Sequence, residues 1–99
     1  MAKRVIWTDT AKNQRKDILE FWDNKTGNKK YSVKISKFIR RKIKHLSKFN
    51  YIGKPTDFQN IRVISDGNFS IFYKLTATKL IIASVWDNRQ DPTKIKKYL

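Results

Sequence analysis

The spacing of apolar residues changes its period near Pro55, and this change is the strongest constraint on the fold. Before Pro55, apolar side chains recur every three to four residues over two long stretches, which is the period of a helix with one buried face. After Pro55 they recur every second residue, which is the period of a strand. We therefore expect an α+β domain in which helices pack on a sheet formed largely by the second half of the chain.

Two helices are predicted in the first half. The first covers residues 9–22, because the Thr8 hydroxyl can accept a hydrogen bond from the first turn and the apolar pattern ends at Trp22, before residues 24–27 (NKTG). Asn28 can cap a second helix, which ends near Phe49. Its apolar face is the clearest periodic feature of the chain and consists of Tyr31, Ile35, Phe38, Ile39, Ile43 and Leu46.

Four strands are predicted around these helices. Residues 3–7 are β-prone and precede the first helix. Residues 61–64 and 69–75 flank an Asp66-Gly67 pair, which is a strong hairpin signal. Residues 80–86 are apolar on both faces, as in a strand covered on both sides, and are expected to form the middle of the sheet.

The expected order is β-α-α-β-β-β, with a two-helix hairpin packed on a small, antiparallel-rich sheet. Asp91 can cap a short helical tail over residues 93–99, with Pro92 as its first helical residue. No repeat or linker divides the chain, so residues 1–99 are expected to form a single domain. The longest apolar run is far shorter than the roughly 20 residues of a membrane span, and there is no signal sequence or cysteine. A cytoplasmic protein without a membrane partner is therefore expected.

The positive charge is concentrated in one segment. The chain has 23 Lys and Arg against 8 Asp and Glu, a net charge of +15. Residues 25–54 contain eleven of the basic residues and no acidic residue. Such a field attracts polyanions, so nucleic acid, an anionic surface or an acidic protein are the expected kinds of partner.

Six basic residues of this segment fall on one line along the second predicted helix, roughly opposite its apolar face. We call them the basic stripe: Lys30, Lys34, Lys37, Arg41, Lys44 and Lys48. Each neighbouring pair of like charges costs an isolated helix about 0.2–0.5 kcal/mol, so helix stability does not explain the pattern. Two interpretations remain open: a solvated face that keeps the protein soluble, and a binding surface for nucleic acid or an acidic protein.

Several common kinds of site are excluded by the residues present. Three glycines, each at a turn, cannot form a glycine-rich phosphate loop, and one histidine without cysteine cannot form a common zinc site. His45 is the only candidate base for a Ser/His/Asp triad, and it lies among Lys and Arg on a helix. Asp87 and Asp91 flank a turn, where capping explains them. No metal and no cofactor are expected, which leaves lysine and arginine as the groups able to hold a phosphate.

Two segments of the second half carry a resemblance to a known family. They are residues 67–74 (GNFSIFYK) and residues 85–92 (VWDNRQDP), and residues 5–8 (VIWT) with Ala11 fit the beginning of the same pattern. The chain resembles the RelE/ParE superfamily, the toxins of bacterial type II toxin–antitoxin systems. The resemblance covers nearly the whole chain and implies the fold order derived above. It also implies an acidic cognate antitoxin as partner.

The resemblance implies one of two activities. One branch of the superfamily enters the ribosomal A site and cuts mRNA without a metal, whereas the other is not a nuclease and poisons DNA gyrase. In the cutting branch, the matching positions assign catalytic roles to Lys54, Arg62, Arg89 and, more loosely, Tyr98. Ser70 stands where that branch has a further arginine.

The large positive excess favours an RNA-rich target, because neutralising phosphates releases counterions. We therefore expect a metal-independent endoribonuclease that cleaves mRNA on the ribosome and arrests growth. The alternative is a ParE-like toxin that poisons gyrase. A basic RNA-binding domain, or a toxin that has lost its activity, is a more distant third possibility.

Overall fold

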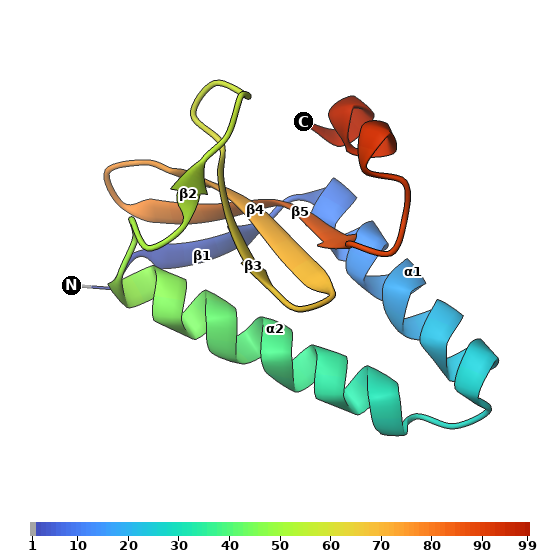
Figure 1. Ribbon diagram of the computed structural model, residues 1–99. Coiled ribbons are helices and arrows are strands. Elements are labelled where there is room, and N and C mark those ends of the chain that lie inside the picture. Colours follow the sequence, from blue (N-terminus) through green and yellow to red (C-terminus); the bar gives the residue numbers. More distant parts are fainter. Residues whose placement is uncertain (1) are drawn as a thin grey trace.

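A computed structural model describes residues 2–99 as one sheet with two α-helices and a C-terminal 3-10 helix (Figure 1). The elements in chain order are β1 (Arg4–Trp7), α1 (Asp9–Thr26), α2 (Lys30–Lys48), β2 (Lys54–Pro55), β3 (Arg62–Asp66), β4 (Phe69–Leu75), β5 (Lys79–Asp87) and η1 (Pro92–Tyr98). The strand order across the sheet is β1-β5-β4-β3-β2. Only β1 and β5 pair in parallel, so the predicted antiparallel-rich α+β fold is confirmed.

Three details differ from the prediction. The helix α1 extends four residues beyond the predicted end at position 22, because Gly27, with φ of +74°, provides the left-handed residue that ends it. Lys54, predicted in a loop, belongs to the two-residue strand β2, which is too short to show a period. Its Pro55 is tolerated because β2 is an edge strand. The middle strand is β4, and β5 lies between β4 and β1.

The β3–β4 hairpin closes one position later than expected. Asp66 is the last residue of β3 and pairs with Phe69, so Gly67 and Asn68 form the two-residue loop. Gly67 has φ of +62° and occupies the first loop position, where type II′ turns take glycine. The hairpin prediction is therefore confirmed, but the assignment of Asp66 to the turn is wrong.

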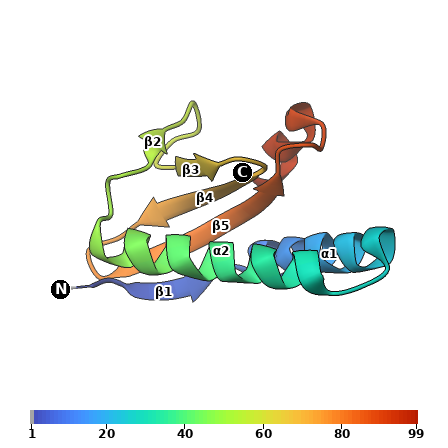
Figure 2. The ribbon, with the colours of Figure 1, turned by 60° about the horizontal axis from the view of Figure 1, so that its bottom comes forward.

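The helices pack as an antiparallel pair on one face of the sheet, and the tip of the pair extends beyond the sheet (Figures 1 and 2). The predicted apolar face of α2 supplies the buried Ile35, Ile39 and Leu46, which join the core cluster with Ile71 of β4 and Ile82 of β5. The N-cap of α2 is Lys29 and not the predicted Asn28, although the Asn28 side chain accepts a hydrogen bond from the Lys30 backbone N–H at 2.9 Å. Within residues 2–99, neither helix combines the length and apolar character needed to span a bilayer.

A register shift in the pairing of β4 with β5 brings side chains from both sides of the shift into the same core. Phe72 pairs with Ser84, whereas Tyr73 pairs with Ile82, so Ala83 is an extra residue. Because of it, Ile82 and Val85 both join the core beneath the helices, although they are three positions apart. This accounts for part of the apolar run of residues 80–86, which only Ser84 interrupts.

The C-terminal segment begins as its capping pattern predicts. The Asp91 carboxylate accepts a hydrogen bond from the Thr93 backbone N–H at 2.9 Å, and the 3-10 helix η1 follows. Ile95 of η1 is buried, and the ring of Tyr98 lies 6.1 Å from that of Trp86. The tail therefore packs against the end of β5.

Candidate functional site

Arg89 follows β5 and lies where both helices meet the sheet. Its Nε donates to Asp87 Oδ1 at 2.9 Å, and its Nη2 donates to Asp87 Oδ2 at 3.0 Å. Nη2 also donates to the hydroxyl of Tyr31 on α2 at 3.0 Å. Three of the five N–H donors of the guanidinium therefore have partners within the protein.

Aromatic rings surround the same guanidinium. Its carbon lies 4.1 Å from the centre of the Trp22 ring and 5.2 Å from that of Phe69, distances typical of cation–π contacts. The indole N–H of Trp22 donates to Asp87 Oδ2 at 3.0 Å, so one carboxylate holds both the arginine and the ring beneath it. These contacts join α1, α2, β4 and the end of β5 at one point.

The charge of Asp87 is stabilised by this arrangement. Its side chain is only 4% exposed, and burial alone raises the pKa. Hydrogen bonds from the side chain and backbone of Arg89 and from Trp22 outweigh burial, so the pKa of Asp87 lies below its ordinary value. The pKa of Arg89 is raised, chiefly by its hydrogen bond to Asp87, so the ion pair persists at every physiological pH.

Arg62 lies at the other end of β3 from Arg89, next to the edge strand β2. Pro55 pairs with Arg62 and Lys54 pairs with Val63, so the side chains of Lys54 and Arg62 point to opposite faces of the sheet. Arg62 Nη2 donates to the carbonyl of Gly53 at 2.6 Å and to that of Tyr51 at 3.3 Å. Its Nε also donates to Gly53, at 3.1 Å, so Arg62 fixes the loop that follows α2.

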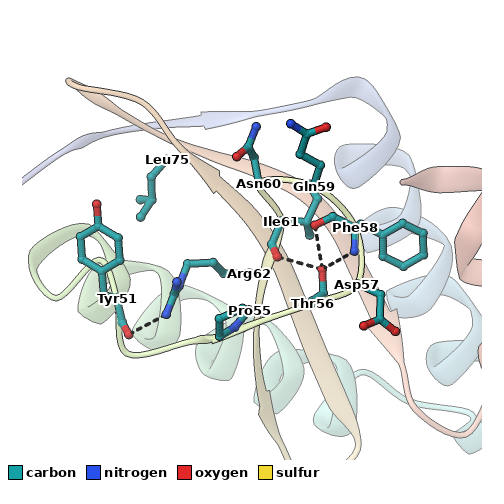
Figure 3. Close-up of a pocket in the computed structure, with 10 residues that line it drawn as sticks. All are labelled: Tyr51, Pro55, Thr56, Asp57, Phe58, Gln59, Asn60, Ile61, Arg62 and Leu75. Carbon is teal, nitrogen blue, oxygen red and sulfur yellow. Dashed lines mark hydrogen bonds between the residues drawn. The ribbon is translucent and has the colours of Figure 1, made fainter.

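A hollow of about 410 Å³ opens beside Arg62 (Figure 3). It is lined by Pro55 of β2, by residues 56–61 of the loop between β2 and β3, by Arg62, by Leu75 and by Tyr51, which is 72% exposed. The guanidinium lies 5.2 Å from the centre of the Tyr51 ring. The hollow thus combines a cation with an exposed aromatic ring, which suits an anionic or aromatic group of a partner.

Ser70 is buried, and its hydrogen bonds are complete. Its hydroxyl donates to Asn88 Oδ1 at 2.8 Å and lies 2.6 Å from the hydroxyl of Ser65, which therefore acts as donor. Because Phe69 and Ile71 face the helices, Ser70 faces the other side of the sheet. A small neutral network therefore occupies the position where the cutting branch has an arginine.

The predicted catalytic residues do not meet at one point. Arg62 pairs across the sheet with Tyr73, whereas Arg89 lies beside Phe69, four residues along the same strand, which is roughly 13 Å at about 3.3 Å per residue. Tyr98 packs on Trp86 in η1. Lys54 and Arg62 are on adjacent strands, but their side chains face opposite sides of the sheet. Across residues 2–99, no three His, Asp or Glu side chains gather closely enough to hold a metal ion.

Sequence reasoning missed the partners of Arg89. Tyr31 was assigned only to the apolar face of the second helix, Trp22 only to the end of the first helix, and Asp87 only to a turn. Trp22 and Asp87 are 65 residues apart, so no local pattern connects them. The one available signal was the Asp-x-Arg spacing after β5, which puts a carboxylate within reach of the guanidinium.

The basic stripe lies on the exposed side of α2. Each of its six members is solvent-exposed, while the opposite side of the helix contributes to the core. The one ion pair that α2 makes in residues 2–99 joins Lys42 to Asp66 at 3.4 Å, and Lys42 is not in the stripe.

Comparison with known proteins places the chain in a family. The family model for the ParE toxin of the type II toxin–antitoxin system parDE matches residues 5–92. No curated protein matches the sequence.

Two solved structures have a similar fold. One belongs to the chromosomal ParDE toxin–antitoxin system of P. aeruginosa, with 17% identity, a TM-score of 0.75, and coverage of 87% of this chain and 96% of the other. The other belongs to the RelBE2 toxin–antitoxin complex of Mycobacterium tuberculosis, with 15% identity, a TM-score of 0.65, and coverage of 88% and 99%. Because the ParE model spans most of the sequence, the chain belongs to the ParE toxin family of type II toxin–antitoxin systems.

Proposed function

We propose that this toxin poisons DNA gyrase and does not cut RNA. The observation that carries the proposal is the state of Arg89, which the cutting mechanism would need beside a phosphate. Its guanidinium is paired with Asp87, bonded to Tyr31 and stacked on Trp22. An arginine held in this way stabilises the fold, and moving it to a phosphate would leave the Asp87 carboxylate buried without its partner.

The other candidate catalytic groups support the same proposal. Ser70 supplies no charge, and Tyr98 and Arg62 belong to separate parts of the surface. Stabilising a phosphorane requires several donors directed at the same oxygens. The match to the ParE family also favours the gyrase branch over the mRNA cleavage that we expected from charge alone.

We also propose that an acidic antitoxin neutralises the toxin. The net charge of +15 supports such a partner, because a complementary charge speeds association and limits self-repulsion. Both solved structures of similar fold come from toxin–antitoxin systems.

Expression in bacteria tests the proposal. We expect induction of this chain to stop growth and to switch on a DNA-damage reporter, while primer extension finds ribosome-bound messages intact. Co-expression of an acidic protein from the adjacent reading frame is expected to restore growth.

Tyr98→Phe is the matched variant, because it keeps the ring that packs on Trp86 and removes only the hydroxyl. We expect it to be as toxic as the wild type. Messages cut at A-site codons without DNA damage, together with loss of toxicity in Tyr98→Phe, would instead support the nuclease and refute the proposal.

A further inference from the structure

The basic stripe is a straight row of charge along α2. From Lys30 to Lys48 the helix rises about 27 Å at 1.5 Å per residue, with one charge every 5 Å or so. The half of the helix nearest Lys30 lies in the tip that extends beyond the sheet (Figure 2). Nothing else in residues 2–99 covers this side of α2, since all six side chains are exposed.

No acidic group of the protein balances the stripe. The ion pairs formed within residues 2–99 are Lys16–Glu20, Lys42–Asp66 and Arg89–Asp87, and none includes a stripe residue. The whole of α2 contains no Asp or Glu. The repulsion along the row is therefore relieved only by solvent ions or by an anionic partner.

The stripe broadens towards α1. Lys34, Lys37 and Arg41 line a shallow hollow of about 350 Å³ together with Arg40. Arg40 also borders a groove of about 370 Å³ between the helices, to which α1 contributes Lys12 and Arg15. The positive surface is thus several side chains wide near the middle of α2, beside the first turns of α1.

The composition of this surface selects the kind of partner. Its exposed aromatic residue is Phe49, at the C-terminal end of α2, so it lacks the row of rings on which proteins that hold single-stranded nucleic acid stack successive bases. Within Lys30–Lys48, Val33 is the one large apolar residue that is well exposed, at 49%, so an acidic peptide would find few apolar anchors. A row of lysines and arginines without either feature suits regularly spaced phosphates.

We propose that the basic stripe binds the sugar–phosphate backbone of double-stranded DNA, without regard to sequence. The choice of DNA rests on the proposed function, because gyrase holds a DNA duplex while it works. The toxin then recognises gyrase together with its bound DNA. The stripe supplies affinity through phosphate contacts, and the rest of the toxin supplies specificity for the enzyme.

Fluorescence anisotropy with the purified full-length toxin and a labelled duplex of about 20 base pairs tests the proposal. If all six charges contact phosphates, the affinity falls by about 10³-fold between about 50 and 200 mM salt. The test variant reverses four charges to Glu: Lys34, Lys37, Arg41 and Lys44. We expect it to bind far more weakly and to reduce the salt slope by about four.

A second variant with the same net charge provides the control. Each set of four reversals changes the net charge from +15 to +7, since each reversal removes two charges. The control reverses four exposed lysines that lie outside α2, on the sheet and η1: Lys74, Lys79, Lys94 and Lys96. We expect it to keep most of the binding, and circular dichroism is expected to show both variants folded.

Equal losses in the two variants would overturn the proposal, because net charge alone would then explain binding. Tighter binding to an RNA duplex than to DNA would also overturn it. So would a stripe variant that binds DNA normally but is no longer neutralised by the antitoxin, since the stripe would then be a protein-binding surface. Loss of DNA binding in the stripe variant with no effect of the wild-type toxin on gyrase would support the stripe and refute the proposed function.

Discussion

Arg89→Ala is expected to lower the free energy of unfolding by about 2–4 kcal/mol at neutral pH. Removing one partner of a fully buried ion pair costs about 3–5 kcal/mol, and the 36% exposure of Arg89 reduces that figure through solvent screening. Asp87 is left buried with Trp22 as its remaining side-chain donor, and the cation–π contact is lost as well. For a domain of this size, the melting temperature is expected to fall by about 10–20 °C.

The pH dependence identifies the cause. In the wild type, the pKa of Asp87 is lowered from 3.8, so its contribution to stability is present above about pH 4 and is lost as the pH falls further. In Arg89→Ala, the side-chain hydrogen bonds that lower the pKa of Asp87 most are lost. Protonation of Asp87 then removes the cost of burying its charge. The stability difference between wild type and Arg89→Ala, measured by urea unfolding, is therefore expected to shrink between about pH 7 and pH 3.

Arg89→Lys is the matched control, because it keeps the charge but not the paired donors, and its loss is expected to be intermediate. An unchanged melting temperature in Arg89→Ala, combined with loss of toxicity, would show that Arg89 acts on the target and not on the fold.

Gly53→Ala is expected to destabilise the protein by about 3 kcal/mol through the loop that Arg62 holds. Gly53 is buried, and its backbone N–H donates a hydrogen bond to the Tyr73 hydroxyl oxygen at 3.0 Å. An added Cβ would collide with that hydroxyl and come within 2.9 Å of the Val63 carbonyl oxygen. Overpacking costs about 1–3 kcal/mol, and disturbing the hydrogen bond adds about 1 kcal/mol.

Comparing the thermal unfolding of Gly53→Ala with that of Gly27→Ala separates the effect of steric crowding from that of backbone strain. Gly27 has φ of +74° and open space around its Cβ position, so its substitution carries only the strain of about 1–2 kcal/mol. Adding Tyr73→Phe to Gly53→Ala removes the colliding hydroxyl, so the double variant is expected to lose less stability than the sum of the single variants. If the losses of stability in the two single variants simply add up in the double variant, the collision between the added Cβ and the Tyr73 hydroxyl is refuted.

The layout of the fold was predictable because its signals are local. All residues of the apolar face of α2 lie in one continuous stretch of sequence, and Gly67 indicates the position of the hairpin to within a few residues. The end of α1 was missed because it depends on a single left-handed glycine, not on the apolar period. Strand β2 was missed because two residues show no period at all.

The candidate site was less predictable because its contacts join distant segments. The resemblance identified Arg89, but its role depends on Trp22, Tyr31 and Asp87, which only the fold brings together. Ser70 was identified as a departure from the cutting branch, and its network with Ser65 and Asn88 depends on pairing across the sheet. The basic stripe was visible as a pattern, and the structure adds that it is exposed and unpaired by acids.

Purified toxin added to DNA gyrase and supercoiled plasmid tests the central proposal most directly, with primer extension on a ribosome-bound message run from the same preparation. We predict that the toxin inhibits the enzyme, that gyrase–DNA complexes containing broken DNA accumulate, and that the message stays intact. A message cut at A-site codons, beside gyrase that works normally, would contradict the account.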